Sequence, residues 1–289
     1  MIYYLSGNDL KLQSAVLRAR GPDANSYLQG QFTQDLKRTE KGPIYGLWLD
    51  QKGKVLADSH IIRLADNDFL IVSFAGPAAP LRARLEAYLI ADEVELHDES
   101  GEWVHFLLWG EVLPEMMLPE GSQRFSSRRA GPRAQELLVP VAHAGEVSAL
   151  LGEKAVVASR EAAELARLRS ALPAVPVDIG PRDLPAEGAL DEVAISFTKG
   201  CYLGQEVIAR LKNLGQVRRA LHVIAGEGAT PVTGAALFQG DRKAGEIRSV
   251  AVEGGGFLAM AMLSLVNLDP AVPLGLVPNG GEIKILRRV

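Results

Sequence analysis

Cysteine is nearly absent from this sequence of 289 residues, which contains one thiol, at Cys201. One cysteine cannot form a disulfide within the chain, and it cannot supply the several thiolates of a structural metal site. Such sparing use is typical of proteins that work in a reducing compartment. Any functional role of a thiol in this protein therefore depends on Cys201 alone.

An excess of charge of either sign is also missing, because 31 Lys and Arg residues face 35 Asp and Glu residues. A chain without a broad positive field holds a phosphate backbone poorly, so we expect no direct contact with nucleic acid. The five histidines are scattered, and no two of them have the spacing of metal ligands. We therefore expect no dedicated metal site built from protein side chains alone.

Long apolar stretches are missing as well. The longest, residues 257–266, contains Ser264 and is far shorter than the ~20 residues that cross a bilayer. The first nine residues lack the cationic start and apolar run of a secretory leader, so we expect a cytoplasmic protein without a membrane span. The signatures of serine hydrolases, Walker-type phosphate loops and dinucleotide-binding folds are absent too, which argues against those enzyme classes.

The residues that are present have the composition of a globular protein, with 47% hydrophobic and 23% charged side chains. Apolar patterns over residues 55–64 and 69–72 predict a strand hairpin. Helical spacing predicts one helix over residues 81–89 and another that begins after Ser159. The mixture of strand and helix patterns predicts an α+β protein.

Two further stretches indicate how the chain is organised. Residues 116–132 are polar and rich in Gly, Pro and Arg, which is typical of a surface loop. From about residue 221, short apolar pieces alternate with Gly-rich turns, which favours a small β-barrel or sandwich. We therefore place a domain boundary near residue 220.

One segment combines a thiol, glycines and the signals of a helix start. It reads Lys199-Gly200-Cys201-Tyr202-Leu203-Gly204-Gln205-Glu206, and apolar residues with helical spacing follow it. A thiol just before a helix N-terminus meets unpaired N–H groups and a partial positive charge, which favour the thiolate. A buried, inert cysteine is the alternative that the residues leave open. The two glycines could let backbone amides approach an anion, or they could be ordinary turn residues.

This segment resembles the signature of the YgfZ family of folate-binding proteins, which are relatives of the glycine-cleavage aminomethyltransferase, GcvT. The resemblance extends over nearly the whole chain. The other matching segments are Asp23–Asp35, Gly53–Asp58, Arg167–Pro173, Leu184–Glu187 and Gly245–Ser249. Such a resemblance implies a GcvT-like α+β fold of several lobes. Residues 1–220 would form two α+β lobes around a central folate opening, divided near residues 115–135, and residues 221–289 would form a small C-terminal β-barrel.

The resemblance also implies a function. It indicates tetrahydrofolate or a derivative as the cofactor, in an accessory protein that supports iron–sulfur cluster assembly or repair. The supported proteins would include iron–sulfur enzymes that modify tRNA. The implied partners are iron–sulfur client proteins or assembly proteins. Whether the chain turns over any reaction is left open by the family likeness.

Carried over position by position, the resemblance implies functional roles for Cys201 and Lys199, and Cys201 could contact an iron–sulfur cluster transiently. It makes Asp58 the acid that faces the folate. The residues implied to hold the folate or shape its loop are Arg167, Gly200, Gly204, Gln205 and Glu206.

Several alternatives stay open at this stage. The aminomethyltransferases have two adjacent acids where this chain has Ala57-Asp58, and a single carboxylate can bind a folate amine without catalysing transfer. A tetrahydrofolate-dependent aminomethyl or one-carbon transferase is therefore the second hypothesis, and a folate-binding module without chemistry is the third. For single residues, the alternatives are an exposed acid on a strand edge for Asp58 and a solvated helix face for Arg167.

Overall fold

The described residues form three five-stranded sheets. The first sheet is antiparallel, and its strands come from the alternating apolar pattern in the N-terminal part of the sequence. The computed structural model describes residues 1–289 except 8–13, 75, 77 and 112–114. The strand order is β3-β4-β5-β2-β6. In that order the strands are Ile44–Leu49, Val55–Ala65, Asp68–Ser73, Ala15–Arg20 and Glu95–Asp98. Helices α2 (Ala24–Gln31) and α3 (Ala78–Glu86) pack on one face around buried Trp48 and Phe69. The predicted hairpin, β4 with β5, is confirmed.

The second sheet combines strands that are far apart in the chain. Its order is β10-β1-β7-β9-β8, and only β1 with β10 is a parallel pair among the described strands of this sheet. In that order the strands are Val156–Val157, Ile2–Ser6, Trp103–Gly110, Gln135–Pro140 and Gln123–Ser126. Helix α4 (Ala144–Lys154) covers one face through Val147 and Leu151. Strand β8 lies within the stretch predicted to be a loop, so that part of the prediction was wrong.

The third sheet is antiparallel and lies at the C-terminal end of the chain. Its order is β12-β13-β14-β11-β15. In that order the strands are Ala236–Gln239, Arg242–Glu253, Gly256–Ser264, Arg219–Glu227 and Lys284–Arg288. Within the described residues, no strand pairing joins the two edge strands β12 and β15. The edge strands are therefore not paired directly. The isolated bridges Phe238–Gly275 and Leu274–Ile283 lie between the two edges, and closure into a barrel stays a prediction.

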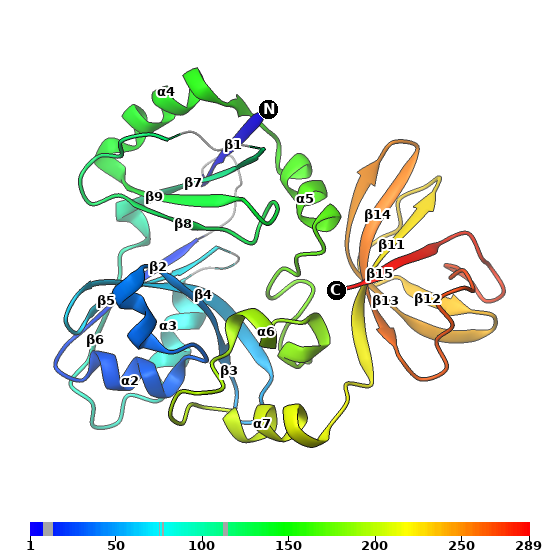
Figure 1. Ribbon diagram of the computed structural model, residues 1–289, viewed down its shortest axis with the longest axis horizontal. Helices are drawn as coiled ribbons and strands as arrows, with labels where there is room; N and C mark the ends of the chain where they lie inside the picture. The colour runs from blue at the N-terminus through cyan, green and yellow to red at the C-terminus, as the bar shows by residue number, and fades with distance from the viewer. Residues whose placement is uncertain (8–13, 75, 77, 112–114) are drawn as a thin grey trace.

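A connecting segment joins the three sheets. Helix α5 (Arg160–Arg169) begins at the capping side chain of Ser159 and lies between the second and third sheets (Figure 1). Helices α6 (Asp191–Ala194) and α7 (Gln205–Leu214) follow beside the first sheet. The short 3-10 turns of the chain are η1 (Leu36–Lys41), η2 (Ser100–Glu102), η3 (Val141–His143) and η4 (Pro185–Gly188).

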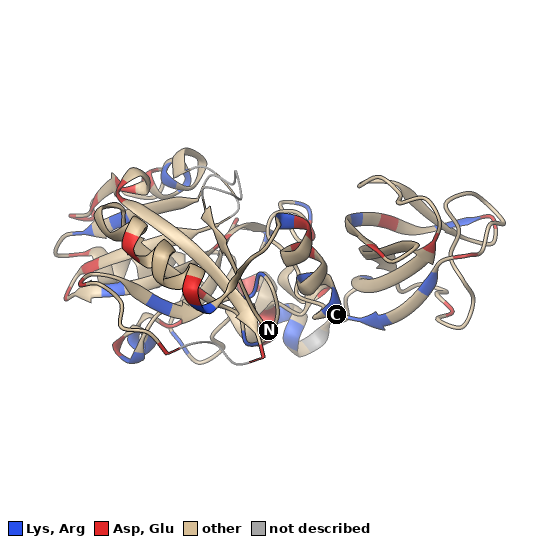
Figure 2. Ribbon diagram, turned by 90° about the horizontal axis from the view of Figure 1, so that it is seen from above, with Lys and Arg blue, Asp and Glu red and all other residues tan. Residues whose placement is uncertain are grey.

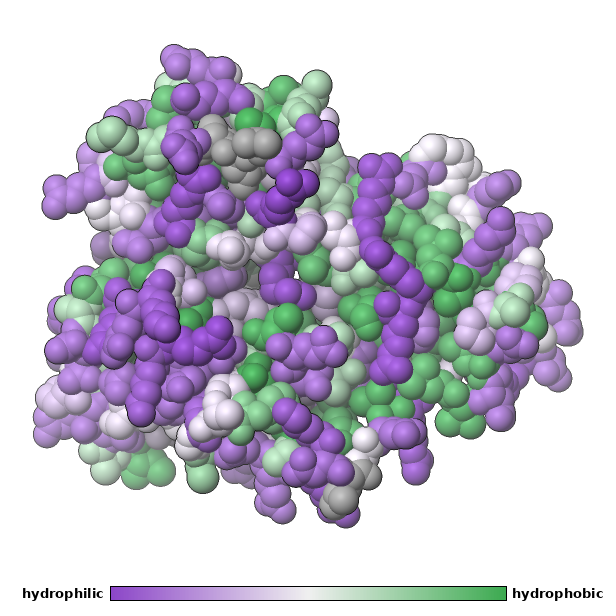
Figure 3. Space-filling view, viewed as in Figure 1, coloured by the Kyte–Doolittle hydropathy of each residue, from purple (hydrophilic) through white to green (hydrophobic). Residues whose placement is uncertain are grey.

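Shared apolar clusters hold these parts together. Ile62 and Val72 of the first sheet pack against Phe125 and Leu138 of the second. A larger cluster combines buried residues of the first sheet, the connecting segment and the third sheet, and Figure 3 shows hydrophobic surface gathered over the third sheet beside that segment. Burial of this kind is the main stabilising contribution to such a junction.

Charge is spread over the molecule without separation by sign. Figure 2 shows basic and acidic residues interspersed over the ribbons, in keeping with the balanced composition. Of the helices that the structure describes, none combines the length and the hydropathy needed to cross a membrane.

Candidate functional site

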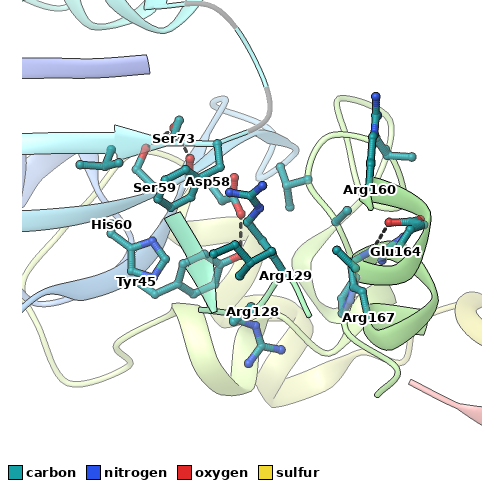
Figure 4. A pocket seen from close by; sticks show the side chains of 18 residues that line it. Tyr45, Asp58, Ser59, His60, Ser73, Arg128, Arg129, Arg160, Glu164 and Arg167 are labelled. Atoms are coloured by element: carbon teal, nitrogen blue, oxygen red, sulfur yellow. Dashed lines mark hydrogen bonds and ion pairs between the residues drawn. The ribbon is translucent and has the colours of Figure 1, made fainter. Parts of the chain in front are cut away.

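Two adjacent cavities lie where the first sheet faces the connecting segment. The arginine cavity has a volume of about 170 Å³ and the apolar cavity about 440 Å³. Polar residues that line the arginine cavity include Tyr45, Asp58, His60, Arg128, Arg129, Arg160, Glu164 and Arg167 (Figure 4). Residues that line the apolar cavity include Trp48, Leu56, Leu81, Arg84 and Pro176. Asp58, Ser73 and Val175 line both cavities, so Asp58 stands at their junction.

Strand alternation on β4 aims Asp58 into this junction. Side chains two residues apart share a face of a strand, and Asp58 and His60 both line the arginine cavity. Tyr45 of the neighbouring strand β3 donates its hydroxyl to Asp58 Oδ2 at 2.8 Å. Burial raises the pKa of Asp58 to about 6, although the Tyr45 hydrogen bond and nearby arginines act in the opposite direction. A carboxyl with this pKa can bind an amine or exchange a proton near neutral pH. The position contradicts the alternative of an exposed acid on a strand edge.

Two arginines that follow strand β8 line the arginine cavity together with Asp58. Arg129 lies 3.3 Å from the fully buried carboxylate of Glu136 and stacks over the ring of Phe74. Arg128 stacks over the ring of Tyr45, with 5.8 Å between its Cζ and the ring centroid. Its Nε atom is buried and has no hydrogen-bond partner in the described part of the chain. The cavity wall therefore carries a positive charge that the protein leaves incompletely paired.

Arg167 lines the same cavity but is held by the protein's own groups. It is 3% exposed, and its guanidinium pairs with Asp178 at 2.6 Å and with Glu164 at 2.5 Å. It also donates to the hydroxyl of Ser249 on β13 at 2.9 Å, which links α5 to the third sheet. This position contradicts the alternative of a solvated helix face. Arg167, which the resemblance implied as a folate-holding residue, therefore forms buried ion pairs that connect α5 to the rest of the protein.

The side chain of Lys199 is hydrogen-bonded to backbone carbonyls at the end of helix α2. Its buried ammonium donates to the backbone carbonyls of Gln29, Phe32 and Gln34 at 2.6, 2.7 and 3.2 Å. Burial lowers the pKa of Lys199 to about 8. The carbonyls at a helix end have no intrahelical partner, and this lysine satisfies several of them. Lys199 therefore fastens the cysteine loop to α2.

Cys201 is exposed, which contradicts the alternative of a buried, inert thiol. The side chains that line the two cavities, among the residues that the structure describes, include none from the segment 199–206. Cys201 therefore lies outside the lining of the two cavities that Asp58 joins. Sequence reasoning placed both residues in one functional set, and that grouping stays a prediction.

The remaining residues of the motif shape the loop. Helix α7 begins at Gln205, as the helix signals predict, and Gly204 before it has a φ of +84°. A Cβ atom at Gly204 would lie 2.6 Å from the carbonyl oxygen of Asp50, so only glycine fits there. A Cβ at Gly200 would meet no described atom within 4 Å. Gln205 is half-buried and Glu206 is exposed in the first turn of the helix.

Sequence reasoning missed Tyr45, Arg128 and Arg129. The register of β3 against β4 brings Tyr45 to Asp58, and that register cannot be derived without knowing which strands pair. Adjacent arginines in a polar stretch are usually solvated, so the pair gave no distinct signal. Among the described residues, no group of three His, Cys, Asp or Glu side chains is placed to hold a metal ion.

Comparison with known proteins places this geometry in context. Residues 13–117 match the family described as the GCVT N-terminal domain. The tRNA-modifying protein YgfZ of Colwellia psychrerythraea is 26% identical, with 92% of this chain and 84% of that protein covered. YgfZ of Aliivibrio fischeri (strain ES114) is 28% identical, with 86% and 82% covered.

A eukaryotic relative and a solved structure extend the comparison. The mitochondrial iron-sulfur cluster assembly factor IBA57 homolog of Cryptococcus neoformans is 27% identical over 72% of this chain, which spans 63% of that protein. The crystal structure of the glycine cleavage system aminomethyltransferase T from Bartonella henselae superposes with a TM-score of 0.80 at 20% identity. The match covers 98% of this chain and 84% of the enzyme. The chain therefore has the fold of that enzyme.

Proposed function

Because the chain belongs to the GcvT-like family that includes the YgfZ proteins, we propose that it binds tetrahydrofolate and supports iron–sulfur cluster assembly or repair. The names of its relatives support this proposal, since the YgfZ proteins are named as tRNA-modifying proteins and the IBA57 homolog as an iron–sulfur cluster assembly factor. Iron–sulfur client or assembly proteins are the proposed partners, and the cytoplasm is the proposed compartment.

The observation that supports the folate part most is the position of Asp58 between an apolar cavity and a cationic one. Ligand pockets typically combine apolar walls with a few placed polar groups, in volumes of roughly 300–1,000 Å³. A reduced folate has aromatic rings, ring amines and a carboxylate tail, and each class of group has a counterpart here. Trp48 and Leu81 offer apolar walls, Asp58 offers an acceptor for an amine, and Arg128 offers a cation.

The thiol supplies the second part of the proposed function. Cys201 is exposed on a loop whose position Lys199 and Gly204 fix. A thiolate is a soft ligand that suits iron, so a rigidly presented cysteine can contact a cluster of a client protein. Folate binding and thiol chemistry are then separable functions of one chain.

Anaerobic calorimetric titration with tetrahydrofolate tests the folate part. We expect saturable binding by wild type and by Cys201→Ala with equal affinity. We expect binding by Asp58→Ala to be weaker by ~10-fold or more, because a charged hydrogen bond contributes about 1.5–3 kcal/mol. Failure of the wild-type chain to bind any reduced folate would exclude this part of the proposal.

Complementation tests the thiol part. In cells that lack this chain, we expect wild type to restore the activity of an iron–sulfur enzyme that modifies tRNA. Cys201→Ala should fail to restore it while retaining tetrahydrofolate binding. Full restoration by Cys201→Ala would instead support a folate-binding module that acts without the thiol.

One observation favours a second candidate function, that of a one-carbon transferase. The raised pKa of Asp58 and its hydrogen bond from Tyr45 suit proton exchange with a folate amine, as a one-carbon transferase requires. Single-turnover assays with an aminomethyl donor and tetrahydrofolate decide between the two. Transfer that depends on Asp58 and survives Cys201→Ala would favour the transferase.

A further inference from the structure

A groove apart from the two central cavities lies between helix α7, helix α6 and the end of strand β15 (Figure 1). Its volume is about 520 Å³, and among the described residues it shares no lining residue with the arginine cavity or the apolar cavity. Ile208 and Leu211 of α7 and Val217 of the following turn give it an apolar floor. This α7 groove is therefore distinct from the proposed folate site.

Two exposed cations stand at the rim of the α7 groove. Lys212 comes from α7 and Arg288 from β15, and no ion pair within the described residues includes either of them. Asp191 and Glu192 of α6 also line the groove. The groove thus combines an apolar floor, two cations without a carboxylate partner in the described chain, and an acidic contribution from α6.

The cations of the α7 groove belong to a basic stretch in a chain whose net charge is −4. In residues 205–219, every acid but one is absent, and Lys or Arg recurs along the helix and the turn after it. Arg219 is held in ion pairs with buried carboxylates. Arg210 and Arg218 are exposed and, like Lys212, have no ion pair in the part of the chain that the structure describes. Exposed cations of this kind attract an anionic partner over a range of about 8 Å at physiological salt.

Lys212 also connects the groove with the segment that presents the thiol. Its ammonium lies 3.3 Å from the centroid of the Phe197 ring. Phe197 is 38% exposed and comes shortly before Cys201 in the chain. A partner bound in the α7 groove would therefore lie near the loop that carries the exposed thiol.

Resting on the proposed function, we infer that the α7 groove docks an acidic segment with an apolar side chain, from the protein whose cluster Cys201 contacts. The apolar side chain packs on Ile208 and Leu211, and its acidic neighbours meet Lys212 and Arg288. Charge complementarity of this kind speeds the encounter and fixes the orientation of a partner. The docked segment thereby holds the client protein close to the thiol during the contact.

Nucleic acid fits the groove less well than a protein segment does. Asp191 and Glu192 would repel a phosphate backbone, although Lys212 and Arg288 would attract it. Single-stranded nucleic acid also binds on aromatic platforms, and the described lining residues of the groove include no aromatic ring. An apolar floor with a charged rim is instead typical of protein–protein interfaces.

Fluorescence anisotropy with a labelled synthetic peptide that alternates Glu and Leu tests the inference. We expect wild type to bind it ~10-fold or more tightly than peptides with Lys in place of Glu or Ser in place of Leu. Lys212→Glu combined with Arg288→Glu should weaken binding of the acidic peptide by ~10-fold or more, because like charges then face each other. Lys37→Glu combined with Arg133→Glu reverses two exposed cations outside the groove and should leave binding unchanged.

The complementation assay described above supplies a readout in cells. We expect Lys212→Glu combined with Arg288→Glu to restore the iron–sulfur enzyme poorly, while its tetrahydrofolate binding equals that of wild type. The control pair, Lys37→Glu with Arg133→Glu, should restore the enzyme fully. Thermal unfolding of each variant verifies that it is folded, and Lys212→Gln carries the test if the doubly reversed variant is not.

The outcomes separate this inference from the proposed function. Wild type that neither binds a reduced folate nor restores the enzyme contradicts the proposed function itself. Wild type that restores the enzyme, with full restoration or unchanged peptide binding by the Lys212 and Arg288 variant, overturns this inference alone. Tighter binding of a single-stranded RNA than of the acidic peptide, lost in the same variant, would assign the groove to nucleic acid and also overturn it.

Discussion

At the scale of single residues, the raised pKa of Asp58 leads to a measurable dependence of stability on pH. Its folded pKa of about 6 lies above the ordinary value of 3.8, so the folded chain holds a proton that the unfolded chain releases between these pH values. The stability contributed by this proton is fully present below pH 3.8 and is lost as the pH rises through 6. At neutral pH, a buried negative charge remains and lowers stability.

Replacement of Asp58 by Asn removes that charge while keeping an oxygen that can accept from Tyr45. We expect Asp58→Asn to raise the free energy of unfolding at pH 7.5 by about 1–2 kcal/mol, with a smaller gain at pH 5. Urea unfolding at the two pH values measures the difference. A gain that is equal at both would show that the Asp58 carboxyl titrates normally. Such trade-offs between stability and binding are common at functional sites.

Lys199 gives a second prediction at this scale. Lys199→Met leaves buried carbonyls of the α2 end without a donor, so we expect the free energy of unfolding to fall by about 3 kcal/mol. Lys37→Met, at an exposed position nearby, should change it by less than about 0.5 kcal/mol. Denaturant unfolding measures both. If Lys199 acted on the thiol alone, its loss would leave stability unchanged and alter only the reactivity of Cys201.

The sequence predicted some of these residues and not others, for physical reasons. Asp58 and Cys201 lie within contiguous motifs, so a resemblance could point to them. The acceptors of Lys199 lie 165 to 170 residues earlier in the chain, and no local pattern records such a contact. Arg128 is distinguished by a buried Nε atom that has no hydrogen-bond partner among the described residues, and such a feature exists only in the folded state.

At the scale of elements, the turn before α7 permits a matched comparison within one motif. Gly204 has a positive φ and no room for a Cβ, whereas Gly200 has open space. We expect Gly204→Ala to lower the free energy of unfolding by about 1–3 kcal/mol and to disturb the cysteine loop. Gly200→Ala should be close to neutral. Unfolding curves measure stability, and equal effects of the two substitutions would contradict the strained-turn account.

Regular elements with strong periodicity were predictable, and short polar ones were not. The hairpin of β4 and β5 and the helices α5 and α7 lie where apolar spacing predicts them, and Ser159 caps the start of α5. Strand β8 was missed because its four residues include one buried apolar side chain, Phe125, among polar ones. Such a strand is specified by its neighbour β9 and by the packing of Phe125 against the first sheet.

At the scale of the whole molecule, Arg167 joins the connecting segment to the third sheet. Arg167→Met would leave the fully buried Asp178 without its ion partner, and we expect a loss of about 3–5 kcal/mol in the free energy of unfolding. Arg167→Met combined with Asp178→Asn should recover part of this loss. Urea unfolding measures both variants. A single variant as stable as wild type would show that Arg167 is not a structural tie.

The prediction of the overall architecture depended more on the family resemblance than on strand and helix patterns in the sequence. Strand and helix patterns predict an α+β class, but the pairing of β1 with β7, across about a hundred residues, has no signature in sequence. The resemblance predicted a GcvT-like α+β fold without its strand pairings, and the aminomethyltransferase superposition supports that fold. The strand pairings leave the closure of the C-terminal barrel as a prediction, because turns and short strands do not specify whether edges meet.

The tie between Lys199 and helix α2 has a consequence for synthesis of the protein. A ribosome makes α2 early, but the lysine that caps its last carbonyls is added about 165 to 170 residues later. During most of translation, the end of this helix therefore has only water or transient partners. Completion of the cysteine motif therefore forms the cysteine loop and also supplies the lysine that caps α2, so a truncated product would lack both the loop and this cap.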